Sequence, residues 1–432
     1  MLSVLANRTY RHLFIAQVIA LIGTGLATVA LGLLAFDLAG AQAGAVLGTA
    51  LAIKMTAYIG VAPVAAAFAE RLPRRTMLVS LDLVRAAVAV LLPFVSEIWQ
   101  VYVLIFVLQS ASAAFTPTFQ ATIPDILPDE RDYTRALSLS RLAYDLESVL
   151  SPMLAALLLT VMSFHSLFAG TVVGFLVSAA MVVSVTLPIA QSSPKRDIYE
   201  RTTRGLRIFL ATPRLRGLLA LNLAIASASA MVIVNTVVLV QSRFGLPQTS
   251  TATALMAFGA GSMLVALILP RLLERLNDRI AMLCGGGVLV VGLFAGALVS
   301  EYPSLLTLWL VLGAGYSLAQ TPSGRILRRS SNAQDRPALF AAQFALSHAC
   351  WLITYPLAGW IGANIGLTSS FICLAVLAAA AWITSAAIWK PEHDEEVLRH
   401  THDDLAADHE HIVDGKDHSH LYVIDDLHRR WP

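Results

Sequence analysis

Twelve apolar runs decide what this chain can fold into. A run of about twenty apolar residues is long enough to cross a bilayer as a helix, and the hydrocarbon interior forces such a segment to satisfy its backbone hydrogen bonds internally. The sequence therefore predicts an all-α integral membrane protein with twelve transmembrane helices. The runs cover approximately residues 12–36, 44–68, 76–95, 99–121, 136–162, 166–190, 215–240, 250–270, 280–299, 303–321, 338–363 and 367–389.

The positions of the cations predict the orientation of these spans, because cytoplasmic loops are enriched in lysine and arginine. The loops on one side carry many arginines and lysines, whereas those on the other side carry only Arg243. We therefore expect a multi-pass protein of a bacterial-type inner (plasma) membrane with both termini in the cytoplasm. The cationic positions include Arg71, Arg74, Arg75, Arg131, the segment 195–207, Arg271, Arg275, Arg279, Arg325, Arg328, Arg329 and Arg336.

The two halves of the chain resemble each other. The motif Glu70-Arg71-Leu72-Pro73-Arg74-Arg75 has a partial copy, Glu274-Arg275-Leu276-Asn277-Asp278-Arg279, 204 residues later, and Pro152 and Pro356 share that offset. Such duplication is typical of transporters whose site lies between repeats. We expect two pseudo-symmetric six-helix bundles, at residues 1–190 and 215–390, joined by a central loop at 191–214 and followed by a polar tail at 391–432.

With these motifs the sequence resembles the major facilitator superfamily (MFS). The superfamily's loop after the second helix reads Gly-x-x-x-Asp-Arg-x-Gly-Arg-Arg, and residues 66–75 keep its charge order while replacing both glycines and the aspartate. The segment 116–141 is similar to the corresponding passage of exporters in this superfamily. The arginine that many proton-coupled exporters carry in the fourth helix is replaced by Phe106. The resemblance implies the MFS fold, and we expect a monomer.

The repeated charged loops are candidates for gates. Glu70 can pair with cations, and Arg71, Arg74 and Arg75 can bridge helix ends when one side of the transporter closes; Glu274, Arg275 and Arg279 occupy the equivalent loop. The alternative is that the arginines only set the topology.

Ionisable residues inside the spans are candidates for function because they are costly at membrane depth. Arg141 and Asp145 are four residues apart and can form an ion pair on one helix face. Glu147 has no cation three or four residues away, which makes it the best candidate for proton coupling. Lys54 can pair with either carboxylate or repel a cationic substrate. Four further residues are candidates for the transport path: His348, which can instead be a hydrogen-bonded structural histidine, and Gln109, Asn222 and Gln343.

The tail combines histidines with carboxylates, and 8 of the 11 histidines lie after Pro391. Imidazole and carboxylate ligands suit Ni²⁺, Co²⁺, Zn²⁺ or Cu²⁺. Residues i and i+2 of an extended strand point the same way, so each His-x-His pair can chelate; an acidic, solvated tail is the alternative. The pairs are His400/His402, His409/His411 and His418/His420. Nickel- and cobalt-resistance exporters of the superfamily are similar in having histidine-rich tails.

These features together predict a secondary active transporter. The absence of a GxxxxGK[ST] motif argues against an ATP-driven pump, and no arrangement of nucleophile and base indicates an enzyme. The first hypothesis is proton-coupled efflux of a divalent transition metal of the nickel or cobalt type. The alternatives are efflux of an amphipathic organic compound and, more weakly, a metal sensor that does not transport. The expected partners are the bilayer, the substrate and protons, without nucleic acid; no cofactor is expected beyond a metal bound by the tail.

Overall fold

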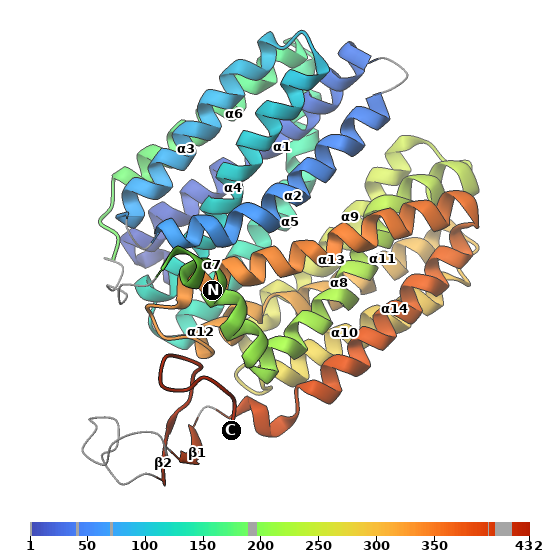
Figure 1. Ribbon diagram of the computed structural model, residues 1–432. Coiled ribbons are helices and arrows are strands. Elements are labelled where there is room, and N and C mark those ends of the chain that lie inside the picture. Colours follow the sequence, from blue (N-terminus) through green and yellow to red (C-terminus); the bar gives the residue numbers. More distant parts are fainter. Residues whose placement is uncertain (1, 40–42, 70–71, 189–196, 396, 402–416) are drawn as a thin grey trace.

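Two bundles of long helices lie at an angle to each other and meet at one end (Figure 1). The computed structural model describes residues 2–39, 43–69, 72–188, 197–395, 397–401 and 417–432. The first bundle contains α1 (Arg8–Ala39), α2 (Ala43–Ala69), α3 (Arg74–Leu91), α4 (Ile98–Ile126), α5 (Glu130–Leu159) and α6 (Phe164–Val183), with short 3-10 turns η1 (Leu2–Ala6) and η3 (Leu92–Phe94).

The second bundle repeats this plan. It contains α8 (Pro213–Val237), which continues as a π-helical turn η4 (Val238–Arg243), and α9 (Gln248–Leu272), α10 (Asp278–Gly296), α11 (Tyr302–Gln320), α13 (Arg336–Asn364) and α14 (Leu367–Ile388). Helix α7 (Ile198–Ala211) connects the bundles, and α12 (Ser323–Arg329) joins α11 to α13. The tail adds η5 (Pro391–Asp394) and two antiparallel strands, β1 (Val397–Thr401) and β2 (Asp417–Leu421).

The all-α membrane fold is confirmed. In the described part of the chain, ten helices are long and apolar enough to span a bilayer, whereas twelve spans were predicted. The other two predicted spans are α2, whose described apolar part is Ala52–Ala67, and α5. Helix α5 differs because it carries Arg141, Asp145 and Glu147 in addition to a charged first turn. Helix α2 is therefore not counted because only part of it is described, and α5 is not counted because it is too polar.

Packing between helices follows the same pattern in both bundles. Helix α1 packs against α6 as α8 packs against α14, and α2 packs against α4 as α9 packs against α11. Across the two bundles, α5 contacts α9 and α13 contacts α2. Helix α5 of the first bundle corresponds to α13 of the second, and α2 corresponds to α9, so each of these contacts is the counterpart of the other. The bundles are therefore related by a pseudo-twofold arrangement.

The apolar cores of the two bundles differ. In the second bundle one continuous cluster extends from α8 to α14 and reaches the tail. In the first bundle the core consists of two main clusters, one around Tyr10 and Tyr133 and another around Leu34 and Phe168. Buried polar side chains occupy the level between those clusters, among them Asp82, which accepts hydrogen bonds from Arg85 and from Ser178.

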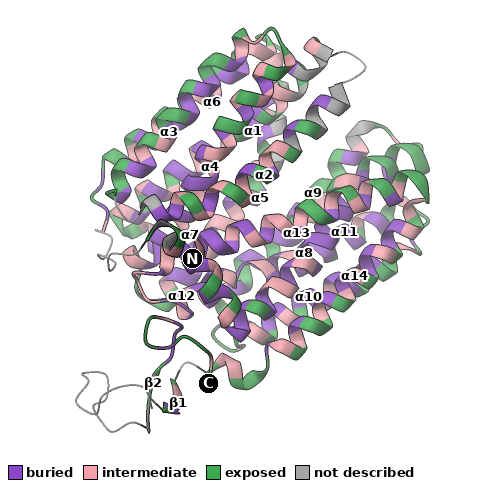
Figure 2. Cartoon of the chain, in the orientation of Figure 1, coloured by how far each residue is buried: buried purple, intermediate pink, exposed green. Residues whose placement is uncertain are grey.

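The outer faces of the bundles remain apolar. Large apolar side chains are exposed along α3, α6, α9 and α14, where Figure 2 shows exposed positions on the outer surface. Exposed apolar surface on this scale needs a nonaqueous environment. These faces therefore fit contact with lipid.

We call the end where the bundles meet the basic end. It holds the start of α3, the α4–α5 connection, α7, α12 and the described part of the tail (Figure 1). Reporter fusions after Lys195 and after His420 are expected to give cytoplasmic signals, because cationic loops are retained on that side. A fusion after Gly245, in the connection at the opposite end, serves as the control and should report the outside. An external signal from the His420 fusion would contradict the predicted orientation.

Candidate translocation path and gate

A cavity of about 340 Å³ lies between the bundles. Its walls come from α1, α2, α4 and α5 of the first bundle and from α11, α12 and α13 of the second. Aromatic rings and amides dominate the lining, and the described lining residues include no cysteine and no carboxylate. The aromatic members are Tyr58, Phe119, Tyr133, Tyr144, Tyr316, Phe340, Phe344 and Trp351, and the amides are Gln17, Gln120, Gln320 and Gln343.

Helix α13 presents one face to this cavity. Gln343, Ser347 and Trp351 follow each other at steps of four residues, a spacing that places side chains on the same helix face, and all three line the cavity. Among the described atoms, Gln343 Oε1 and Trp351 Nε1 are buried and have no hydrogen-bond partner. A buried polar group without a partner is costly. Both residues line the cavity but these two atoms are covered, so a bound molecule can satisfy this acceptor and this donor only after their side chains turn toward it.

His348 lies among aromatic rings. The centroid of its ring is 4.7 Å from that of Tyr58, 4.2 Å from that of Phe344 and 4.9 Å from that of Trp351. Its Nδ1 is 2.7 Å from the carbonyl oxygen of Phe344 on the same helix. His348 is therefore a hydrogen-bonded histidine, the alternative that the sequence left open, and among the described residues it belongs to no group of three or more metal-ligating side chains.

Gln109 and Lys54 meet at Tyr58 rather than in the cavity itself. The Tyr58 hydroxyl donates to Gln109 Oε1 at 3.0 Å, and the ammonium of Lys54 lies 5.5 Å from the centroid of the Tyr58 ring. Neither side chain lines the cavity. Both side chains therefore position the Tyr58 ring, and this ring lines the cavity.

The ion pair predicted on α5 forms. Arg141 Nε lies 3.2 Å from Asp145 Oδ2, and Asp145 is buried. Arg141 also donates to Ser262 Oγ of α9 at 3.0 Å and lies over the Tyr316 ring of α11 at 4.5 Å. Because α9 and α11 belong to the second bundle, Arg141 links the two bundles at the wall of the cavity.

Glu147 faces α1 rather than the cavity. A Cβ atom added to Gly25 of α1 would lie 2.6 Å from Glu147 Oε1 and 2.2 Å from Ser151 Oγ, so α1 approaches these two side chains closely at its glycine. Lys54 of α2 is the cation that acts on it electrostatically. Glu147 thus lies between three helices of one bundle, and its role in proton coupling stays a prediction.

Asn222 was predicted to line the transport path, but the structure places it elsewhere. It is buried within the core of the second bundle, and it does not line the cavity. Both of its side-chain amide atoms are without a hydrogen-bond partner among the described atoms.

The basic end is closed by ion pairs between the bundles. Asp125, at the end of α4, pairs with Arg74 of α3 at 2.5 Å and with Arg336 of α13. Arg74 and Arg336 are 5% and 12% exposed, so these charges are largely removed from water. One carboxylate therefore holds a cation from each bundle.

Helix α12 makes a second closure. Arg325 contacts Glu130 and donates to Thr134 of α5, the latter at 2.6 Å, and it reaches the buried Asp278 of α10 at 2.9 Å. The Tyr133 hydroxyl donates to the carbonyl oxygen of Gly324 at 3.3 Å. These contacts join α5 to α10 and α12 at the end of the cavity nearest α12.

The predicted gate residues are only partly in this closure. Arg74 belongs to it, whereas Arg75 donates to Val183 O and Arg279 donates to Trp389 O at 2.5 Å, each within its own bundle. Glu274 and Arg275 are exposed. Glu70 and Arg71 lie outside the described residues.

The main acceptors of the gate, Asp125 and Asp278, were missed. Both lie where an apolar run meets a basic loop, and Asp278 is part of the duplicated motif. Their position at the boundary between an apolar run and a basic loop was the signal in the sequence that could have identified them.

Two helical bundles around a cavity, joined by ion pairs at one end, are the architecture of a membrane transporter whose site lies between its repeats. The chain belongs to the Major Facilitator Superfamily, whose family model matches residues 13–295 and 218–416. This is a family of transporters, which agrees with the prediction that the chain is not an enzyme.

Relatives in sequence include transporters and efflux proteins. The chain is 23% identical over 338 residues to the uncharacterized MFS-type transporter YfiS of Bacillus subtilis, covering 73% of this chain and 78% of YfiS. It is 26% identical over 152 residues to macrolide efflux protein A of Streptococcus pyogenes, covering 33% of this chain and 37% of that protein.

Solved structures share the fold at low sequence identity. The human organic anion transporter MFSD10 (TETRAN) superposes with a TM-score of 0.77 at 12% identity, over 88% of this chain and 99% of the other. The Escherichia coli fucose:proton symporter FucP superposes with a TM-score of 0.71 at 14% identity, over 88% and 98%.

Proposed function

We propose that this transporter exports an amphipathic organic compound with an aromatic or other flat apolar part, and that protons drive the export. The observation that carries the proposal is the cavity, whose lining is largely aromatic and includes Gln343 and Trp351, two residues with an unpartnered buried acceptor and donor. Its volume of about 340 Å³ is at the lower end of the range of small-molecule pockets, about 300–1,000 Å³.

Three further points support this proposal. Aromatic rings bind flat apolar groups well, and Arg141 at the wall is neutralised by Asp145, so the cavity does not select strongly for one charge. The efflux relative shares the direction of transport that we propose. The closed basic end is the state in which an exporter would release its substrate on the opposite side.

Export of a divalent transition metal is the second candidate. The histidines of the tail favour it, but the cavity contributes a single imidazole, His348, as a metal ligand among the described residues. A dehydrated divalent ion needs several nitrogen, oxygen or sulfur ligands. The tail therefore supports metal binding more directly than metal transport.

A growth comparison tests the two candidates. Cells with and without the protein would be exposed to a panel of Ni²⁺, Co²⁺ and Zn²⁺ salts and of toxic amphipathic compounds. We expect the protein to protect against members of the organic group. Protection against metals alone would contradict the proposed function and favour the second candidate.

Trp351→Phe is expected to raise the KM for the exported compound about two- to twelvefold, since a hydrogen bond contributes about 0.5–1.5 kcal/mol. The variant keeps the aromatic ring and removes only the indole N–H. Trp360→Phe is the matched control, because Trp360 is on the same helix but 61% exposed. Equal effects of the two substitutions on KM would show that the Trp351 donor does not bind substrate.

A further inference from the structure

The C-terminal segment is packed against the basic end of the second bundle. Tyr422 and Ile424 are buried and belong to the core cluster of that bundle. The guanidinium of Arg214, on α8, lies 5.3 Å from the centroid of the Trp431 ring. The Tyr422 hydroxyl donates to the carbonyl oxygen of Arg430 at 2.7 Å. This part of the tail is therefore folded onto the transporter.

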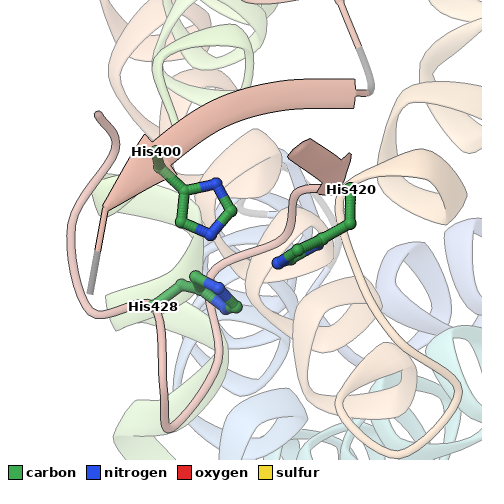
Figure 3. Close-up of side chains that lie close together, drawn as sticks. All are labelled: His400, His420 and His428. Carbon is green, nitrogen blue, oxygen red and sulfur yellow. The ribbon is translucent and has the colours of Figure 1, made fainter. Parts of the chain in front are cut away.

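Three histidines come together where this segment crosses the hairpin of β1 and β2. Figure 3 shows the rings of His400, His420 and His428 turned toward one another. One ligand atom from each lies within 4.8 Å of the others. The ring centroids are 4.6 Å apart for His400 and His420, 5.0 Å for His400 and His428, and 5.1 Å for His420 and His428.

The set differs from the predicted His-x-His pairs. His400 and His420 were predicted ligands, but they come from different pairs and are joined by His428, which was not predicted. His418 lies opposite His400 in the strand register, and its side chain is not described. His402, His409 and His411 lie outside the described residues. The ligands are thus gathered by the hairpin and the C-terminal turn rather than by adjacent positions in one strand.

Hydrogen bonds at Nδ1 prepare all three rings for a metal. Nδ1 of His400 lies 3.1 Å from the Leu398 carbonyl oxygen, and that of His420 lies 2.8 Å from the Leu421 carbonyl oxygen. Nδ1 of His428 lies 2.9 Å from Asp425 Oδ1. An acceptor at Nδ1 favours the tautomer with its proton there, which makes Nε2 the nitrogen with a lone pair. Such contacts are typical of partners that orient metal-binding histidines.

Asp425 fixes the turn that carries His428. Its Oδ1 also accepts from the backbone N–H of Leu427 at 2.9 Å and of His428 at 2.8 Å. The Asp425 side chain therefore holds both the backbone and the ring of His428 in place.

Arg204 connects the same turn to the helix between the bundles. This residue of α7 donates to Asp426 at 2.5 Å and to both carboxylate oxygens of Asp335 at 3.0 Å. Burial disfavours the charge on Arg204, but Asp335 and Asp426 outweigh it and raise its pKa. The position of the turn is thus tied to α7 and to the start of α13.

We propose that His400, His420 and His428 form a binding site for one divalent transition-metal ion, and that the bound ion fastens the C-terminal segment to the basic end. Three imidazoles suit Zn²⁺, Co²⁺ or Ni²⁺. Tetrahedral coordination with bonds of about 2.0–2.1 Å separates ligand nitrogens by roughly 3.4 Å, so the rings need to close by about 1 Å or a little more. The remaining coordination positions take water. This site is separate from the transport cavity and does not depend on the substrate proposed above.

Co²⁺ binding to the purified full-length protein tests the site. The visible spectrum reports coordination by nitrogen, and titration gives the stoichiometry and the Kd. We expect His428→Ala to weaken high-affinity binding at least tenfold, and Asp425→Asn to weaken it about 10- to 100-fold through the loss of the oriented ring. His428 is informative because it belongs to none of the His-x-His pairs.

The matched control replaces His402, His409 and His411 together with alanine. It removes the same number of imidazoles as the triple variant H400A/H420A/H428A and should leave the Kd unchanged. Size-exclusion profiles would establish that each variant is folded. As a second measurement, Co²⁺ should slow tryptic cleavage after Arg429 and Arg430 in the unmodified protein and not in His428→Ala. Loss of binding in the control, or unchanged binding in H400A/H420A/H428A, would overturn the proposal.

Discussion

Glu147→Gln is expected to reduce transport driven by a pH gradient to the rate of empty liposomes. Glutamine has nearly the same size as glutamate but cannot bind or release a proton. Glu147 is the carboxylate of α5 that lies against Gly25 and Ser151, while Asp145 is held by Arg141. A carboxylate without a fixed arginine partner can change its protonation state during a transport cycle at lower cost.

Proteoliposomes allow coupling to be separated from substrate movement. Glu147→Gln should still exchange labelled for unlabelled substrate across the membrane without a gradient, because that reaction needs the cavity and not net proton transfer. Ser151→Ala is the control, since it removes the neighbouring hydroxyl and keeps the titratable group. If Glu147→Gln responds to the gradient as the unmodified protein does, Glu147 is not the coupling residue, and Asp145 becomes the next candidate.

Asp125→Asn is expected to open the basic end. The substitution leaves Arg74 and Arg336 without their shared carboxylate, and removing one partner of a buried ion pair typically costs about 3–5 kcal/mol. Arg336 belongs to the second bundle and meets Asp125 only where the bundles come together at the basic end. Part of this cost therefore destabilises the closed state and not the open one. A bias of even about 1.4 kcal/mol changes the ratio of two conformations about tenfold.

The distance between Arg131 and Glu274 reports this opening. Both residues are exposed and border one surface pocket at the basic end, each from a different bundle. Spin labels on cysteines at these positions, with serine at the three native cysteines, should show a longer distance gaining population in Asp125→Asn. Asp132→Asn is the matched control, because its pair with Arg135 lies on one helix with both side chains about a third exposed or more, and such surface pairs contribute about 0–1 kcal/mol. An unchanged distance distribution in Asp125→Asn would show that this carboxylate does not hold the gate.

Features with a local or repeating signal could be predicted from the sequence. The apolar runs predicted the helices, and the i,i+4 spacing predicted the pair of Arg141 and Asp145. His348 was weighed as a hydrogen-bonded histidine, and its neighbour at i−4 is indeed its partner. In each case helix geometry alone sets the contact, and helix geometry can be inferred from the spacing of the residues in the sequence.

Contacts that depend on how distant segments meet could not be predicted. Asp125 and Arg336 are 211 residues apart, and His428 reaches His400 only because a hairpin and a turn bring them together. The cavity likewise depends on how each helix is rotated: the rotation of α13 places Gln343 on the cavity wall, and that of α8 places Asn222 inside the second bundle. Nothing in residue spacing determines those rotations.

The unequal cores of the two bundles give them different mechanical roles. The second bundle has one large apolar cluster that extends from α8 to α14 and reaches the tail, so we expect its helices to move together. The first bundle has a polar layer between two apolar clusters, and that layer includes Asp82, Arg85 and Asp145. A shift of its helices at this level would exchange polar contacts rather than apolar ones. We therefore expect the first bundle, which also carries Glu147, to deform more readily than the second during transport.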